Sequence, residues 1–148
     1  MRAPRFEASF PSLASKLSAT HRLRIPGARP CPCISVGKFY KGLSVSVPLH
    51  LSQLKAGASA EQIHAALAAR YAGERFVRVM PLRDPAVLDD GFFDVQACND
   101  TNRVDIFVFG NDTQVLLMCR LDNLGKGASG AAVQSMNVHL GVDEGLGL

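Results

Sequence analysis

Three glycines near the end of the sequence have the spacing of turns that bind a phosphate group. In the stretch LDNLGKGASGAAVQSMN, residues 121–137, Gly125, Gly127 and Gly130 form the pattern G-x-G-x-x-G, after an apolar run and before an expected helix. Such glycines let the backbone approach a pyrophosphate at the N-terminus of the helix. Taken alone, the pattern predicts a dinucleotide-binding turn.

The neighbouring sequence does not support a self-contained dinucleotide site. Such a fold needs a further strand and an acidic residue about 20 positions after the glycines, but the sequence ends 18 residues after Gly130. Two interpretations remain. Small residues could simply let the helix pack closely against another backbone. Alternatively, Asp122, Asn123 and Lys126 beside the free N–H groups of a helix start could form half of a site for an amide, carboxylate or phosphate.

Composition restricts the other functions that the 148 residues could have. Hydrophobic residues make up 47% of the chain and charged residues 20%, which fits one folded domain. The net charge of +3 is uneven: residues 1–33 carry six Lys/Arg and one acid, whereas residues 34–148 carry ten Lys/Arg and twelve Asp/Glu. The slightly acidic folded part argues against a nucleic-acid surface. Apolar runs are shorter than the roughly 20 residues that span a membrane, so we expect no membrane partner.

The cysteine pattern predicts neither a metal site nor secretion. Cys31 and Cys33 have no second Cys or His pair at zinc-finger spacing, so we expect no metal. Cys119 lies within the apolar run VLLMCRL, which indicates a buried side chain. With no secretory signal before these thiols, a reducing cytoplasm is the expected compartment.

From residue 34 onward, the sequence predicts alternating strands and helices. Residues 42–51 alternate apolar residues and serines, typical of a strand with one buried face. Ser59 and Gln62 form a capping box for a helix that Gly73 ends, and residues 75–81 form a short strand. Residues 103–121 predict a hairpin turning at 110–112, and a helix follows from about 128 to 140. The predicted class is α+β, with a mixed, largely antiparallel sheet and helices packed on one face.

Four blocks of the sequence, in order, resemble the shorter subtype of the N-acetyl-gamma-glutamyl-phosphate reductase family. The stretch RLDNLGKGASGAAVQSMN resembles its C-terminal signature, and SVGKFYKGLSVSVPLHL its strand and loop. RYAGERFVRVMP and CNDTNRVDIFVFGND are similar to two further segments. The resemblance runs from about residue 35 to 148. It implies a fold like the C-terminal catalytic and dimerisation domain of glyceraldehyde-3-phosphate and aspartate-semialdehyde dehydrogenases.

The resemblance also implies a reaction. An enzyme of this family uses NADPH to reduce N-acetyl-gamma-glutamyl phosphate, an acyl phosphate, to the semialdehyde in arginine biosynthesis. A cysteine thiolate forms a thioester, hydride transfer releases the aldehyde, and a histidine acts as acid and base. The implied partners are this small-molecule substrate and, in the full-length enzyme, a second copy of the chain.

Several parts of the family pattern are absent from this sequence. The G-C-Y-type turn of the nucleophile is not found, and neither Cys31 nor Cys33 matches it. His21 lies near the place of the catalytic histidine but has lost the second His and the Pro-Glu pair, so it is a candidate remnant with no catalytic residue assigned beside it. The Rossmann domain that would bind most of the NADPH is missing. We therefore expect residues 34–148 to be an incomplete dehydrogenase-like domain that is inactive alone.

Residues 1–33 do not match the family, and we expect them to be poorly ordered. Their Arg- and Ser-rich, acid-poor composition fits a transit peptide. It also fits a tail from a truncated or mis-framed sequence, which the abrupt loss of the family pattern near residue 34 favours.

The resemblance assigns candidate binding residues to two segments. Asn123, Lys126, Gly127 and Gly130 would face the nicotinamide end of the NADP cofactor. Lys41 and Gly42 lie where the longer subtype has an Arg-Gly that fixes the substrate, although a lysine offers a point charge and not a bidentate fork. An exposed loop lysine is an equally good interpretation of Lys41. The alternative to an enzyme part is a stand-alone α+β oligomerisation module without catalysis.

Overall fold

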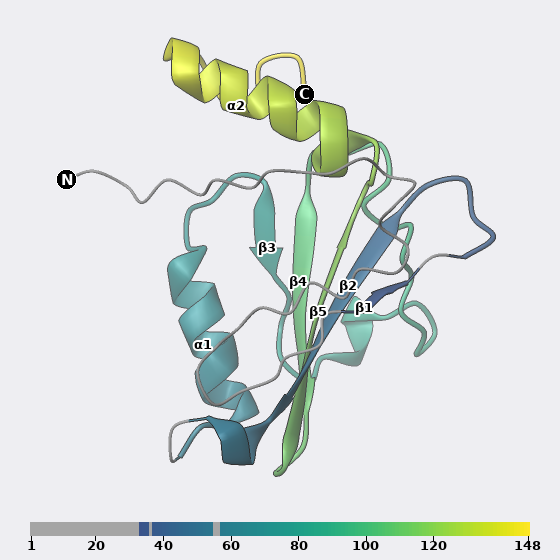
Figure 1. Ribbon diagram of the computed structural model, residues 1–148, viewed down its shortest axis with the longest axis vertical. Helices are drawn as coiled ribbons and strands as arrows, with labels where there is room; N and C mark the ends of the chain where they lie inside the picture. Colours follow the sequence, from purple (N-terminus) through teal and green to yellow (C-terminus); the bar gives the residue numbers. More distant parts are fainter. Residues whose placement is uncertain (1–32, 36, 55–56) are drawn as a thin grey trace.

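The core of the protein is a five-stranded sheet (Figure 1). The computed structural model describes residues 33–35, 37–54 and 57–148, so His21 and Cys31 lie outside the described residues. The strand order is β1-β2-β5-β4-β3. The strands span β1 Cys33–Ser35, β2 Leu43–His50, β3 Val77–Val79, β4 Val104–Gly110 and β5 Gln114–Leu121.

The sheet is mixed and largely antiparallel, as predicted, and the α+β class is confirmed. Among the described strands, the edge pair β3 and β4 is parallel, and the β1–β2, β2–β5 and β4–β5 pairs are antiparallel. The predicted hairpin is β4–β5, and its turn is held by Asn111, whose side-chain oxygen accepts bonds from the backbone N–H groups of Thr113 and Gln114. Strand β1 was not predicted, because three residues carry too little alternation to identify a strand.

Helix α1, Ala60–Arg70, covers one face of the sheet beside β3 and β4 (Figure 1). Its start is capped as predicted: the Ser59 hydroxyl accepts a hydrogen bond from the Gln62 N–H at 3.3 Å. Ala60 packs with Val108 and Val115 in the centre of the core. Around this centre lie half-buried apolar side chains, namely Leu49, Leu51, Ile63, Leu67, Leu82 and Leu117.

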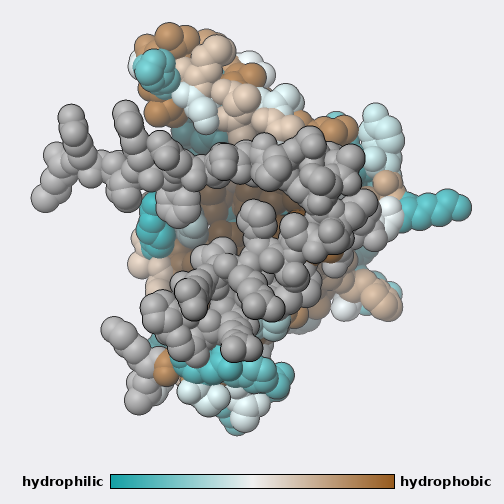
Figure 2. Space-filling view, in the orientation of Figure 1, coloured by the Kyte–Doolittle hydropathy of each residue, from teal (hydrophilic) through white to brown (hydrophobic). Residues whose placement is uncertain are grey.

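Helix α2, Gly130–Leu140, lies across the end of the sheet (Figure 1). It begins two residues later than predicted, because a π-helical turn over Gly125–Ser129 comes first. Of its residues only Gly130 and Asn137 are buried. Figure 2 shows hydrophobic side chains over this helix, where Met136 and Leu140 are 53% and 64% exposed. None of the helices in the described part of the chain is long and apolar enough to cross a membrane.

The face of the sheet opposite α1 carries a buried ionic row. Asp105 is fully buried and accepts hydrogen bonds from Arg78, Arg103 and Arg120, at N–O distances between 2.8 and 3.1 Å. Burial alone raises the pKa of Asp105, but the hydrogen bonds, led by that of Arg78, outweigh it and hold the pKa at about 2. The Arg120 guanidinium also lies 4.9 Å from the Phe107 ring centre. This row ties β3, β4 and β5 together close to the end where the candidate site lies.

Candidate functional site

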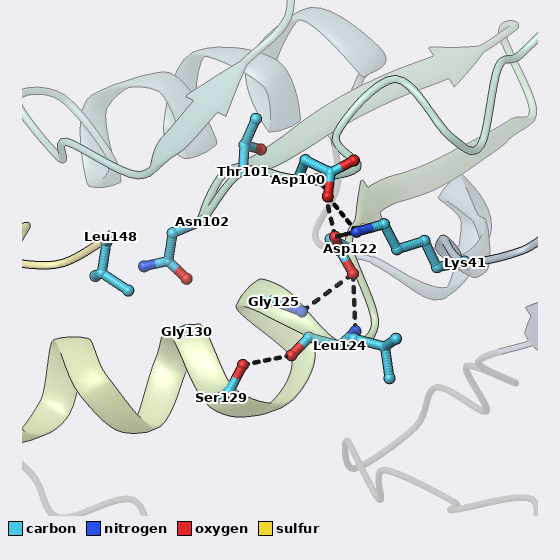
Figure 3. A pocket seen from close by; sticks show the side chains of 10 residues that line it. All are labelled: Lys41, Asp100, Thr101, Asn102, Asp122, Leu124, Gly125, Ser129, Gly130 and Leu148. Carbon is cyan, nitrogen blue, oxygen red and sulfur yellow. Dashed lines mark hydrogen bonds and ion pairs between the residues drawn. The ribbon is translucent and has the colours of Figure 1, made fainter.

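Three loops meet at the end of the sheet where β2 and β4 begin and β5 ends (Figure 3). They are residues 37–42, residues 98–103 and the turn 122–130. The backbone N–H of Gly42 donates a hydrogen bond of 2.7 Å to the side-chain oxygen of Asn123, 81 residues away. The structure therefore brings together the two segments in which the sequence placed substrate-binding and cofactor-binding residues.

Asp122 joins these three loops. Its Oδ1 accepts hydrogen bonds from the backbone N–H groups of Leu124 and Gly125, at 2.8 and 3.0 Å. Its Oδ2 accepts the N–H of Asp100 at 2.8 Å and lies 3.1 Å from the Lys41 ammonium nitrogen. Burial alone raises the pKa of Asp122, but these bonds outweigh it and hold the pKa at about 2. Asp122 is thus a buried carboxylate that stays ionised.

Lys41 lies between two carboxylates of unequal burial (Figure 3). Hydrogen bonds first to Asp100 and then to Asp122 raise the pKa of Lys41. The side chain of Asp122 is 2% exposed, whereas that of Asp100 is 82% exposed. The Lys41 backbone is also fixed, because its carbonyl accepts a bond of 2.8 Å from the Asn99 side chain. The Lys41 ammonium is therefore held in place beside one buried carboxylate, that of Asp122, and one exposed carboxylate, that of Asp100.

The glycine pattern serves close packing in this structure. A β-carbon on Gly130 would lie 2.3 Å from the Asn102 side-chain oxygen and 2.9 Å from the backbone of Gly125. A β-carbon on Gly127 would lie 3.1 Å from the Leu121 side chain. The first N–H groups of the turn, which sequence reasoning left free for an anion, are bound by Asp122. The turn therefore already holds a carboxylate of its own.

The Lys126 ammonium contacts other residues than the Lys41 ammonium does. Its ammonium donates to the side-chain oxygen of Gln134 and lies 5.6 Å from the ring centre of Phe76. Burial lowers the pKa of Lys126. Gln134 also accepts a bond of 3.1 Å from the Asn102 amide, so Lys126 is linked to the site through two side chains.

A cavity of about 300 Å³ opens where the loops meet. It contains the Lys41 ammonium and the carboxylates of Asp100 and Asp122, which leaves one negative charge in excess. Its lining is shown in Figure 3 and consists of Lys41, Asp100, Thr101, Asn102, Asp122, Leu124, Gly125, Ser129, Gly130 and Leu148.

The cavity includes residues that sequence reasoning did not select. Lys41 and Gly130 line it, Gly42 and Asn123 are bonded beside it, and Lys126 and Gly127 are not among its lining residues. Asp100 and Asn102 were missed as site residues, whereas Asp122 was named beside the glycine turn but not as the residue that binds the N–H groups of that turn. A signal for this role of Asp122 is present in the sequence. An aspartate at the start of a tight turn commonly accepts hydrogen bonds from the backbone N–H groups two and three residues later.

Both described thiols are unsuited to nucleophilic attack. Cys98 is fully buried, and burial raises the pKa of its thiol. Burial also raises the pKa of Cys119 in β5, which is half-buried rather than buried as predicted. A nucleophile must be a thiolate at the pH of the reaction. Neither Cys98 nor Cys119 meets that condition.

Known proteins resemble a large part of this chain. The family model described as "Semialdehyde dehydrogenase, dimerisation domain" matches residues 33–123. An N-acetyl-gamma-glutamyl-phosphate reductase 2 of Nostoc sp. is 55% identical over 117 residues, which are 77% of this chain and 36% of that protein. The reductase of Rhizobium etli is 49% identical over 108 residues, 72% of this chain and 34% of the relative. The chain thus spans about a third of the length of these relatives. By its fold and by the family model that covers most of its described residues, the chain belongs to the semialdehyde dehydrogenase dimerisation-domain family.

Proposed function

We propose that residues 33–148 serve as the dimerisation domain of an NADPH-dependent N-acetyl-gamma-glutamyl-phosphate reductase in the cytoplasm. The observation that carries the proposal is the bond between Gly42 and Asn123, which joins the segment predicted to bind the substrate to the segment predicted to bind the cofactor. The names of the Nostoc and Rhizobium relatives support the substrate. Because burial raises the pKa of the Cys98 and Cys119 thiols, neither is suited to be the nucleophile of the reaction, which we expect another part of the enzyme to supply.

Asn123 fits a role at the nicotinamide end of the cofactor. Its oxygen already accepts the Gly42 N–H, so the side chain is oriented with its NH₂ group left to donate. Within the described part of the chain, no residue accepts a hydrogen bond from that group. A carboxamide oxygen is a suitable acceptor. NADPH would supply the hydride, while Asn123 and the turn that contains Lys126, Gly127 and Gly130 would orient one end of it.

Lys41 fits a role in binding an anionic group of the substrate. Asp122 and the Asn99 side chain hold it in place before any ligand arrives, so little conformational entropy is lost on binding. Gly42 beside it has φ of 126°, and a β-carbon there would lie 3.0 Å from the Val95 carbonyl. That β-carbon would also lie 3.3 Å from the side-chain oxygen of Asn99, the residue that holds the Lys41 carbonyl, so a glycine at position 42 keeps the surroundings of Lys41 undisturbed.

We also propose that the domain pairs with a second copy of itself through the sheet face opposite α1. On this face a groove of about 420 Å³ runs along the ends of β2, β4 and β5. Pro48, Leu116 and Phe109 are neighbours in register there, so apolar side chains from three strands form one surface. The family description of a dimerisation domain supports this role.

A chimera tests the enzymatic part of the proposal. Residues 33–148 would replace the matching region of the Nostoc reductase, and NADPH oxidation would be followed with the acyl phosphate as substrate. We expect activity within about tenfold of the parent enzyme, which corresponds to a change of about 1.4 kcal/mol or less in the activation free energy. A chimera that folds and dimerises like the parent but does not oxidise NADPH would contradict the proposal. The 148-residue chain alone should be inactive, and activity there would place the nucleophile within it.

A further inference from the structure

Asp100 stands at the solvent side of the Lys41 ammonium, where an incoming anion would have to bind. Its carboxylate bonds to Lys41 and lines the cavity together with Asp122. The two carboxylates are held differently. Asp122 accepts three backbone N–H groups, whereas among the described residues the side chain of Asp100 has Lys41 as its one hydrogen-bonding partner.

The backbone of Asp100 is fixed independently of its side chain. Its N–H donates to Asp122 at 2.8 Å, and its φ of 59° lies in the left-handed region, so the loop holds an unusual conformation. The carboxylate can therefore leave Lys41 by rotating about its own side-chain bonds, without a movement of the loop. With 82% of the side chain exposed, water replaces the lost contact at little cost.

We propose that Asp100 is a displaceable internal counter-ion that occupies the anion-binding position of Lys41 and lowers its affinity for oxyanions. The inference rests on the proposed function for the identity of the anion, the carboxylate or phosphoryl group of the substrate. Asp122 stays bound when the ligand enters and keeps the ammonium in place. When the ligand binds, its oxyanion takes the place of the exposed Asp100 carboxylate beside Lys41. Binding is therefore reversible, and an oxyanion that binds Lys41 only weakly does not displace Asp100.

Charge-neutral variants at position 100 test this inference directly. Asn and Gly both tolerate a φ of 59°, so Asp100→Asn and Asp100→Gly remove the carboxylate and keep the turn. Inorganic phosphate and acetate would be titrated separately into the ¹⁵N-labelled full chain at constant ionic strength, and the amide signals of Gly42 and Thr101 followed. We expect both variants to bind at least one of the two oxyanions about two- to fivefold more tightly than the unmodified chain, as for loss of one exposed charge contact.

Matched controls separate this effect from a general change of charge. Asp112→Asn removes an exposed carboxylate in the β4–β5 turn, at the far end of the sheet, and should leave the affinity unchanged. Lys41→Met should abolish binding in both backgrounds, whereas Lys38→Met, in the same loop, should not. Equal affinities of the Asp100 variants and the unmodified chain for both oxyanions would overturn the inference, as would binding that survives Lys41→Met. Because neither dimerisation nor NADPH oxidation enters this measurement, its failure is distinguishable from failure of the proposed function.

Discussion

The side-chain oxygen of Asn102 lies 2.3 Å from the position that a β-carbon on residue 130 would occupy. Asn102 is 7% exposed and comes from the loop before β4, and its amide also bonds to Gln134 of α2. The hydrogen bond to Gln134 holds α2 against the end of the sheet, and the nearby Asn102 oxygen requires a glycine at residue 130, the first residue of α2.

Gly130→Ala should therefore destabilise the domain. The new methyl group would overlap Asn102 and the Gly125 carbonyl, and overpacking of this kind costs about 1–3 kcal/mol. Urea unfolding measures the loss. Gly127→Ala is the milder comparison, because its β-carbon would lie 3.1 Å from the end of the Leu121 side chain and 3.2 Å from the Asp122 carbonyl, so that shifts of a few tenths of an ångström relieve both contacts. If the two variants lost the same stability, close packing at Asn102 would not be the reason for the glycine.

The low pKa of Asp122 predicts that the domain loses stability in acid. Its folded pKa of about 2 lies below its ordinary value of 3.8, so its contribution is complete above about pH 4 and is lost as the pH falls towards 2. The size is about 2 kcal/mol. Asp122→Asn should lower the free energy of unfolding at pH 7 and flatten its decline between pH 4 and 2. An unchanged acid limb in the variant would show that other carboxylates account for it.

The strands and the turn chemistry were largely predictable from the sequence, because they depend on local patterns. The alternation in residues 42–51, the Ser59 cap and the Gly110 to Asp112 turn each identify an element through neighbours a few positions away. The parallel pairing of β3 with β4 has no such local signal. It follows from where α1 packs, which a short apolar run does not specify.

The candidate site could be predicted only in part. The resemblance selected Lys41 and Asn123, but their meeting depends on hydrogen bonds between residues up to 81 positions apart. Asp100 looks like an ordinary loop residue in the sequence. Its importance comes from a difference in burial between two carboxylates on one ammonium, and that difference exists only in the folded protein.

Asp105 should be among the most sensitive positions in the domain. Asp105→Asn would leave Arg120, which is 7% exposed, buried without a counter-ion, and breaking a buried pair costs about 3–5 kcal/mol. Arg78→Ala should cost about 1 kcal/mol or less, because its side chain is 48% exposed. Chemical denaturation of both variants gives the order. A larger loss in Arg78→Ala would mean that the edge strand, and not the buried charge, limits stability.

The described thiols should be unreactive in the folded protein. In a Cys31→Ser, Cys33→Ser background, Cys98 and Cys119 should react slowly with a thiol reagent at pH 7, because burial raises the pKa of both and restricts access. Ellman's assay before and after addition of urea measures this, and both thiols should react once the chain unfolds. Rapid reaction of one thiol in the native state would identify a candidate nucleophile within the domain.

The sheet face opposite α1 should be the surface that joins two copies. Leu116 lines the groove on this face, between Pro48 on β2 and Phe109 on β4, so Leu116→Lys would introduce a charge into the contact of both copies at once. In a two-fold dimer the same patch contacts itself, which doubles the effect of one substitution. Light scattering should give a dimer for the unmodified chain and a monomer for Leu116→Lys, with circular dichroism confirming that the variant is folded. Met136→Lys is the control, because Met136 is 53% exposed on α2, the helix that lies across the end of the sheet (Figure 1). A dimer that persists in Leu116→Lys but dissociates in Met136→Lys would assign the interface to α2, and a monomer for the unmodified chain would remove self-association from the proposed function.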